Sequence, residues 1–231
     1  MEISINIQKK SILLSPKQQG LATAAYTRKA LLPEFLSQLS QAKSHWEPEI
    51  SLTVHENTLK KMIVKYAEQS VYRPLEEIKY WFAYSSGAFI EPGYQPLFYG
   101  RDKNQTISPN VSAVASVGEG VAGFLAQRLY KCRKLARPNH DFPDIVMESD
   151  DYKTTYLVEA KATISSKINS DTVEVKQRIE ERVYDELPRL TAYASSCLKL
   201  DNRPVIGILI GTALLRETNY FCYMVEVEYE V

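Results

Sequence analysis

Three residues in two neighbouring segments are of types that could do chemistry together. Asp144 stands at the start of one apolar run, and Glu159 and Lys161 lie within the next. Two carboxylates can share a hard cation such as Mg²⁺, which prefers oxygen ligands. An ammonium group beside them can stabilise charge that develops on a phosphoryl oxygen. Together the three residues suit metal-assisted cleavage of a phosphodiester bond.

The two runs flank a polar, turn-like stretch at residues 148–153, and this pattern predicts a β-hairpin. In an antiparallel pair, the numbers of opposed residues add to a constant. Pairing Asp144 with Glu159 centres the turn between Asp151 and Tyr152, in the middle of the polar stretch. The two acidic residues would then lie directly across from each other, with Cβ atoms roughly 4.5–5.5 Å apart.

Side chains alternate between the two faces of a strand. Leu157, Glu159 and Lys161 therefore share one face of the second run, so the two acids and the lysine converge on one side. The other face carries small apolar residues that suit packing under a helix, namely Val158, Ala160 and Ala162. The alternative is a surface hairpin with an ordinary Glu–Lys ion pair, but two acids buried on one sheet face without a cation would be costly.

Pro143-Asp144 and Glu159-Ala160-Lys161 resemble the two halves of the motif of the PD-(D/E)xK phosphodiesterase superfamily, the fold of many restriction endonucleases. The resemblance implies an α/β fold with an α-β-β-β-α-β core, in which helices flank a mixed central sheet. It implies a Mg²⁺ site, with Mn²⁺ as an alternative ion, formed by Asp144, Glu159 and the backbone carbonyl of Ala160. Lys161 would orient the attacking water or neutralise the transition state.

The order of predicted elements divides the chain into two parts. Residues 106–231 should form the nuclease-like domain, and residues 1–105 an N-terminal α+β region that recognises the target or mediates dimerisation. The linker candidate is the stretch from Glu91 to Gly100, which is rich in Pro, Gly and Tyr. In the second part, we expect a helix over 112–132, a strand at 133–137, the hairpin of 143–163, a helix over 171–200 and strands over 205–215 and 220–227. In the first part, we expect strands over 3–7 and 50–54 and helices over 17–42 (broken at Pro33), 59–66 and 75–84.

A third acid lies on the first helix of the nuclease-like domain. Glu119 is surrounded at helical spacing by small residues, while valines and leucines line the opposite side. Such a helix is expected to be buried, and its carboxylate then needs a partner. The resemblance implies that Glu119 completes the metal site, and a salt-bridged helix acid is the alternative. The flanking glycines weaken the helix by about 1 kcal/mol each, which close approach to the sheet would explain.

Two other kinds of site are poorly supported. Gly118, Gly120 and Gly123 satisfy the dinucleotide-binding pattern. However, Glu119 would place a carboxylate beside the pyrophosphate, and the segments that follow form a hairpin rather than a βαβ unit. Serine or cysteine hydrolysis is also disfavoured, because the chain has three histidines and no nucleophile elbow.

Basic residues follow the first helix, with no acid between Glu119 and Asp141, and they lead toward Asp144. Such a run can contact a phosphate backbone, although half of it would suit a solvated helix end equally well. The run consists of Arg128, Lys131, Arg133, Lys134 and Arg137. The resemblance adds Lys176 and Gln177, in the first turns of the second long helix, as candidates for contact with the substrate or the attacking water.

Composition places outer limits on function. The 231 residues are 45% hydrophobic with zero formal net charge, which allows a substantial core and indicates no global attraction to a polyanion. The three cysteines form no disulfide or zinc pattern, and neither a signal peptide nor a membrane-spanning run is present, which favours the cytoplasm. We therefore predict a cytoplasmic, Mg²⁺-dependent nuclease, an endonuclease of restriction or repair type with DNA as the favoured substrate. Cutting both strands would suit a homodimer, and a non-catalytic nucleic-acid-binding module on the same fold is the alternative.

Overall fold

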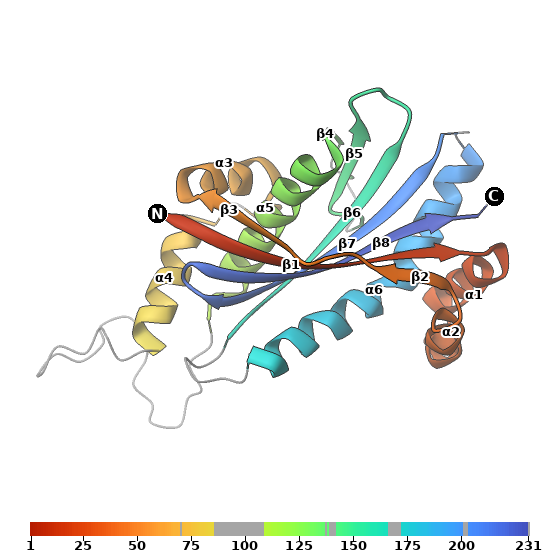
Figure 1. Ribbon diagram of the computed structural model, residues 1–231, viewed down its shortest axis with the longest axis horizontal. Helices are drawn as coiled ribbons and strands as arrows, with labels where there is room; N and C mark the ends of the chain where they lie inside the picture. Colours follow the sequence, from red (N-terminus) through yellow and green to blue (C-terminus); the bar gives the residue numbers. More distant parts are fainter. Residues whose placement is uncertain are drawn as a thin grey trace, which may run out of the picture.

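The computed structural model describes residues 1–69, 71–85, 109–136, 138, 142–165, 172–200 and 203–230. These residues form an α/β structure in which one mixed sheet lies between two layers of helices (Figure 1). The strands are β1 (Glu2–Leu14), β2 (Lys43–Trp46), β3 (Ile50–His55), β4 (Cys132–Ala136), β5 (Ile145–Ser149), β6 (Thr155–Ile164), β7 (Val205–Arg216) and β8 (Asn219–Tyr229). The helices are α1 (Pro16–Thr27), the short 3-10 helix η1 (Lys29–Leu31), α2 (Leu32–Leu39), α3 (Glu56–Tyr66), α4 (Pro74–Ser85), α5 (Val111–Tyr130) and α6 (Thr172–Leu200).

The sheet joins the two predicted parts of the chain. Its strand order is β2-β1-β8-β7-β6-β5-β4, and β3 pairs with β1 beside β2. The N-terminal strand β1 runs parallel to the C-terminal strand β8, from Ser4 opposite Asn219 to Leu14 opposite Tyr229. The predicted element order of the second part, helix, three strands, helix and two strands, is confirmed. The predicted division at residues 105 and 106 lies outside the described residues and stays a prediction.

Each face of the sheet is covered by its own helices (Figure 1). Alternation along β1 explains how one strand serves both layers. Ile3, Ile5 and Ile7 lie in a core with α3, α4 and α5, whereas Ile12 and Leu14 lie in a second core with α1, α2 and α6. The sheet therefore separates α5 from α6, and any site at the β5–β6 hairpin can receive side chains from both layers.

Helix α6 lies very close to the sheet. Its buried residues Val175, Ile179 and Val183 recur at helical spacing, as expected for an amphipathic helix. A Cβ atom at Gly211 of β7 would lie 2.6 Å from a side-chain carbon of Ile179, so glycine is needed for this approach. Because β7 is the neighbour of β6, this packing brings the middle of α6 beside the second half of the hairpin.

Some N-terminal elements differ from prediction. Strand β2 was not expected, because Lys43–Trp46 is exposed along its length and has no apolar alternation. The predicted helical stretch 17–42 is interrupted after Thr27. Pro33 lies in the first turn of α2, where its missing N–H costs no helical hydrogen bond. Among the described residues, no helix combines the length and apolar character needed to cross a membrane.

Candidate functional site

The β5–β6 hairpin has the predicted register. Ile145 pairs with Val158 and Glu148 with Thr155. In each pair the two residue numbers have the same sum as those of Asp144 and Glu159. The turn is held by Ser149, whose carbonyl accepts the Tyr152 N–H at 3.0 Å. Asp144 directly precedes β5, so it lies across from Glu159 as predicted.

The two faces of β6 are also as predicted. Val158 belongs to the core under α5, and a Cβ atom at Gly118 of α5 would lie 2.5 Å from the Cβ of Ala162. Leu157 lies in the opposite core with α6, and Lys161 contacts α6 from the same face. The Glu159 and Lys161 side chains therefore face α6, while the small residues between them face α5.

The carboxylates of Asp144 and Glu159 each accept a backbone hydrogen bond from the opposite side of the hairpin. The backbone N–H of Asp144 donates to Glu159 Oε2 at 3.1 Å, and the N–H of Ala160 donates to Asp144 Oδ2 at 2.7 Å. A strand residue directs its N–H and C=O toward the same neighbour. The carbonyl of Ala160 is thus directed to the same side as Asp144, so the residues of the predicted metal site are neighbours across the two strands.

Lys161 joins the sheet to α6 through two ion pairs. Its Nζ lies 2.7 Å from Glu159 Oε1 and 3.1 Å from Glu186 Oε1 on α6. Burial alone would lower the pKa of Lys161, but the two glutamates outweigh burial and raise it. The ammonium group therefore stays charged and is fixed in direction. Sequence reasoning did not find Glu186, because the alignment of α6 along β6 depends on packing rather than on local pattern.

Glu159 is the buried acid of this cluster, with 2% of its surface exposed. Burial raises its pKa to about 8, and the nearby Asp144 carboxylate adds to the rise, while Lys161 opposes it. The Glu159 carboxyl is therefore harder to ionise than a free one, even with Lys161 beside it. A divalent ion between Glu159 and Asp144 would favour the ionised form, because metal ligands must be deprotonated.

Glu119 is brought to Asp144 from the other side, together with an acid that the sequence did not reveal. Glu119 is 8% exposed, and its Oε2 accepts the backbone N–H of Glu68 at 2.5 Å. Among the described residues, Glu68, Glu119 and Asp144 each offer a carboxylate oxygen within 4.8 Å of the others. Asp144 thus connects this trio to Glu159. Glu68 follows α3 and gives no sequence signal, since its place depends on how α3 packs on α5.

The glycines of α5 explain that packing, and their position argues against a dinucleotide-binding site. They lie in the middle of a continuous helix, not in a strand-to-helix turn. Close approach to the sheet holds for Gly118, as predicted. Gly120 and Gly123 instead lie against α3, where added Cβ atoms would be 2.5 Å from Ile63 and 2.2 Å from Tyr66.

The predicted basic run does not form one surface. Arg133 Nε donates to Glu148 at 2.9 Å, while Lys134 Nζ donates to the carbonyl of Lys65 at 2.8 Å. As neighbours on β4 they point to opposite faces. Arg128 lies beside β3, and Lys131 is exposed at the end of α5. The last member, Arg137, lies outside the described residues.

The α6 candidates lie away from the Lys161–Glu186 ion pair. Lys176 is positioned over the ring of Phe221 at 4.4 Å, and Gln177 donates to Glu181 at 3.1 Å. Lys176 is ten residues before Glu186, which corresponds to about 15 Å along a helix. Besides Glu186, Arg182 of α6 contacts β6 beside Lys161, since its Nη1 donates to the Ala162 carbonyl at 3.0 Å.

The segment before Asp144 is fixed by aromatic contacts with α6. Phe142 is buried, and the Arg189 guanidinium lies 4.4 Å from the centre of its ring. The ring of Tyr193, one helical turn further on, lies 5.1 Å from the same ring. These contacts hold the chain two residues before Asp144 and so limit where its carboxylate can lie.

Comparisons of the chain with protein-family models, with curated proteins and with solved structures give no match. Its function is therefore inferred from the residues and their geometry.

Proposed function

We propose that this chain is a Mg²⁺-dependent nuclease that hydrolyses phosphodiester bonds in DNA through a metal-activated water. The observation that carries the proposal is the reciprocal arrangement of Asp144 and Glu159, with the Lys161 ammonium 2.7 Å from Glu159. The helix–strand order from α5 to β7 around a mixed sheet is compatible with a restriction endonuclease-like fold, which is part of the same proposal.

The donor atoms fit a hard divalent ion. Asp144, Glu159 and the Ala160 carbonyl offer oxygen atoms only, which is the ligand type that Mg²⁺ and Mn²⁺ prefer. The raised pKa of Glu159 fits as well, since a cation would relieve the repulsion between two close carboxylates. Glu119, with Glu68 beside it, extends this acidic surface beyond Asp144 and could hold a second ion or its water.

The bound ion would make water a better nucleophile and stabilise charge on the phosphoryl oxygens. Lys161 contributes a fixed positive charge at the place where negative charge develops, and its two ion pairs hold it there before the substrate arrives. Glu159 keeps Lys161 aimed into the cluster from the sheet, and Glu186 does so from α6. Phe142 and its α6 contacts keep Asp144 in register with Ala160.

The test is cleavage of plasmid and linear DNA by the purified protein in Mg²⁺ or Mn²⁺. We expect cleavage by the wild type, loss of cleavage in Asp144→Asn and Lys161→Met, and normal cleavage in Asp185→Asn, an exposed acid of α6. Inactive wild type, or equal cleavage by all variants, would overturn the proposal. DNA binding that depends on salt but is indifferent to EDTA would then favour the non-catalytic binding module.

A further inference from the structure

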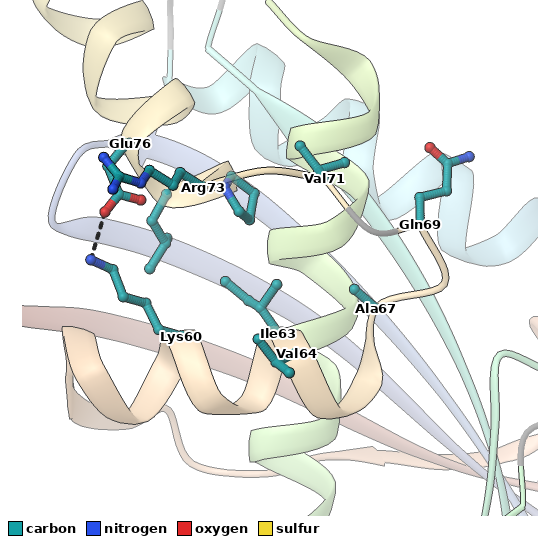
Figure 2. Close-up of a pocket in the computed structure, with 10 residues that line it drawn as sticks. Lys60, Ile63, Val64, Ala67, Gln69, Val71, Arg73 and Glu76 are labelled. Atoms are coloured by element: carbon teal, nitrogen blue, oxygen red, sulfur yellow. Dashed lines mark hydrogen bonds and ion pairs between the residues drawn. The ribbon is translucent and has the colours of Figure 1, made fainter.

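A slot lies between α3 and the segment that leads into α4. Its volume is about 640 Å³, within the range of small-ligand sites. Figure 2 shows Ile63, Val64 and Ala67 along one side and Val71 on the other, which gives the slot an apolar wall. The Lys60–Glu76 ion pair, 2.6 Å long, closes the end near α4.

The segment at the other end of the slot includes one member of the carboxylate trio. Ala67 and Gln69 line the slot, and Glu68, which lies between them in the chain, is a member of that trio. Two hydrogen bonds fix this segment on α5. The Glu68 N–H donates to Glu119, and the Ser116 hydroxyl donates to the Gln69 carbonyl at 3.3 Å. The slot and the trio therefore share this segment, which is held in place by α5.

A cation, Arg73, lines the slot, and an exposed aromatic ring lies next to that cation. Lys60 forms ion pairs with Glu56 and Glu76, whereas the contact of the Arg73 guanidinium is with the ring of Tyr72. Arg73 has a positive φ of 51°, in the left-handed region that is unfavourable for residues other than glycine. Its guanidinium lies 5.0 Å from the ring centre of Tyr72, which is 78% exposed. An exposed aromatic ring beside an arginine is typical of surfaces that bind single-stranded nucleic acid.

We propose that this slot binds the nucleotide next to the scissile phosphate. The apolar wall would receive the sugar or base, Tyr72 would stack on a base at the rim, and Arg73 would contact the adjoining phosphate. The inference rests on the proposed function, because the trio that contains Glu68 marks where the scissile phosphate would lie. It assigns substrate binding to α3 and α4, which come from the N-terminal region rather than from the hairpin or the basic run.

The test compares Tyr72→Ala and Arg73→Ala with Tyr26→Ala in α1 and Arg28→Ala directly after it, the same residue types exposed at the opposite face of the sheet. We expect Tyr72→Ala to raise KM for a single-stranded or frayed DNA substrate about fivefold or more, with kcat and Mn²⁺ affinity unchanged. Arg73→Ala should also raise KM and lower the salt dependence of binding by about one phosphate contact. The α1 variants should match the wild type.

Binding of a fluorescent thymidine oligonucleotide, measured in Ca²⁺ to limit turnover, separates the two proposals. Weaker binding in both slot variants and normal binding in both α1 variants supports the slot as the nucleotide site. If cleavage requires Asp144 but the slot variants change neither its kinetics nor DNA binding, the proposal that the slot binds a nucleotide is wrong. The proposed nuclease function would still stand. Slot-dependent binding without cleavage by the wild type would overturn the nuclease and leave the slot as a nucleic-acid site.

Discussion

Two clusters of charged side chains lie against the sheet, and they differ in how their charges balance. In the first, Glu159 and Glu186 share the single ammonium of Lys161, and the backbone N–H of Asp144 donates to Glu159. In the second, Lys9 of β1 lies 2.7 Å from Glu47 and 2.9 Å from Glu226 of β8. We call these the hairpin cluster and the Lys9 cluster.

Every acid of the Lys9 cluster has a second donor. Glu47 accepts a hydrogen bond from the Ser11 hydroxyl, and Glu226 accepts one from the Tyr130 hydroxyl. Although burial opposes ionisation, Lys9 outweighs it and lowers the pKa of Glu47. In the hairpin cluster burial wins, and the pKa of Glu159 rises to about 8. Both clusters hold more carboxylates than ammonium groups, but only in the Lys9 cluster do the donors keep a carboxyl pKa low, which suits a role in stability. In the hairpin cluster the Asp144 carboxylate adds negative charge beside Glu159, which a cation would neutralise.

The sharpest separation of the two clusters comes from replacing each lysine by methionine. Lys161→Met should lower kcat for DNA cleavage by about 10²–10³-fold, because it removes fixed charge from the transition state. Lys153→Met, on the exposed turn of the same hairpin, is the matched control. If Lys161→Met retains the wild-type kcat, Lys161 has no catalytic role.

Lys9→Met should have the opposite profile. It leaves Glu47 and Glu226 without their shared cation in a place where the Lys9 side chain is only 12% exposed. Breaking a buried ion pair on one side costs about 3 kcal/mol, so urea unfolding should show a clear loss in the free energy of unfolding. Cleavage per folded molecule should not change. A loss of activity without a loss of stability would contradict the distinction between the clusters.

The clusters also show which parts of this molecule can be predicted from sequence. The hairpin register followed from arithmetic on Asp144 and Glu159, because an antiparallel turn allows few pairings and alternation then assigns the faces. The inward direction of Lys9 also has a sequence signal, although it was not predicted. Lys9 continues the period of two set by Ile3, Ile5 and Ile7, and residues at that spacing share one face of a strand.

Other features had no local signal. The place of β1 beside β8 joins residues from opposite ends of the chain, and neither strand carries a mark of its partner. Glu68 and Glu186 are ordinary helix-end and helix-surface acids in sequence. They reach the site because Gly120 lets α3 approach α5, and because Gly211 lets α6 approach β7. Helix–sheet and helix–helix packing determine these contacts, and one sequence does not specify such packing by pattern alone.

The pH dependence of stability should have opposite signs in the two clusters. Without divalent ions, Glu159 binds a proton more tightly in the folded than in the unfolded state, so its contribution to stability is lost as pH rises from 4.5 to about 8. Mn²⁺ should therefore raise Tm more at pH 8 than at pH 6. For Glu47, with its lowered pKa, the contribution is present above 4.5 and is lost as pH falls further.

Thermal unfolding across this pH range in EDTA, with and without added Mn²⁺, measures both effects. Glu159→Gln should remove the decline toward pH 8 and the stabilisation by Mn²⁺. Glu47→Gln should leave both and reduce only the loss at acidic pH. A decline toward pH 8 that persists in Glu159→Gln would assign that titration to another group.

A smaller effect is expected where the hairpin cluster meets α6. Glu186→Gln removes one of the two partners of Lys161, and Glu159 would have to serve both Lys161 and the metal. Residues that orient catalytic groups in this way typically contribute about tenfold or more. We expect kcat to fall about tenfold, with KM and Mn²⁺ affinity retained, and Glu186→Asp to recover part of it. Asp185→Asn, the adjacent exposed acid, should match the wild type, and an equal loss in both variants would indicate a general charge effect of α6.

The smallest effect tests whether the Lys9 cluster depends on its second donors. Tyr130 ends α5 and donates its hydroxyl hydrogen to Glu226, and burial, with Glu226 nearby, raises the pKa of Tyr130. Tyr130→Phe keeps the ring that packs on Tyr156 but removes this donor, so the free energy of unfolding should fall by about 1 kcal/mol. Tyr26→Phe on α1 is the exposed control. Because Lys9 remains in place, the loss should be smaller than in Lys9→Met, and cleavage should be unchanged. A loss as large as that of Lys9→Met would mean that the hydroxyl contributes as much to the stability of this cluster as the ammonium, which would contradict the central role given to Lys9.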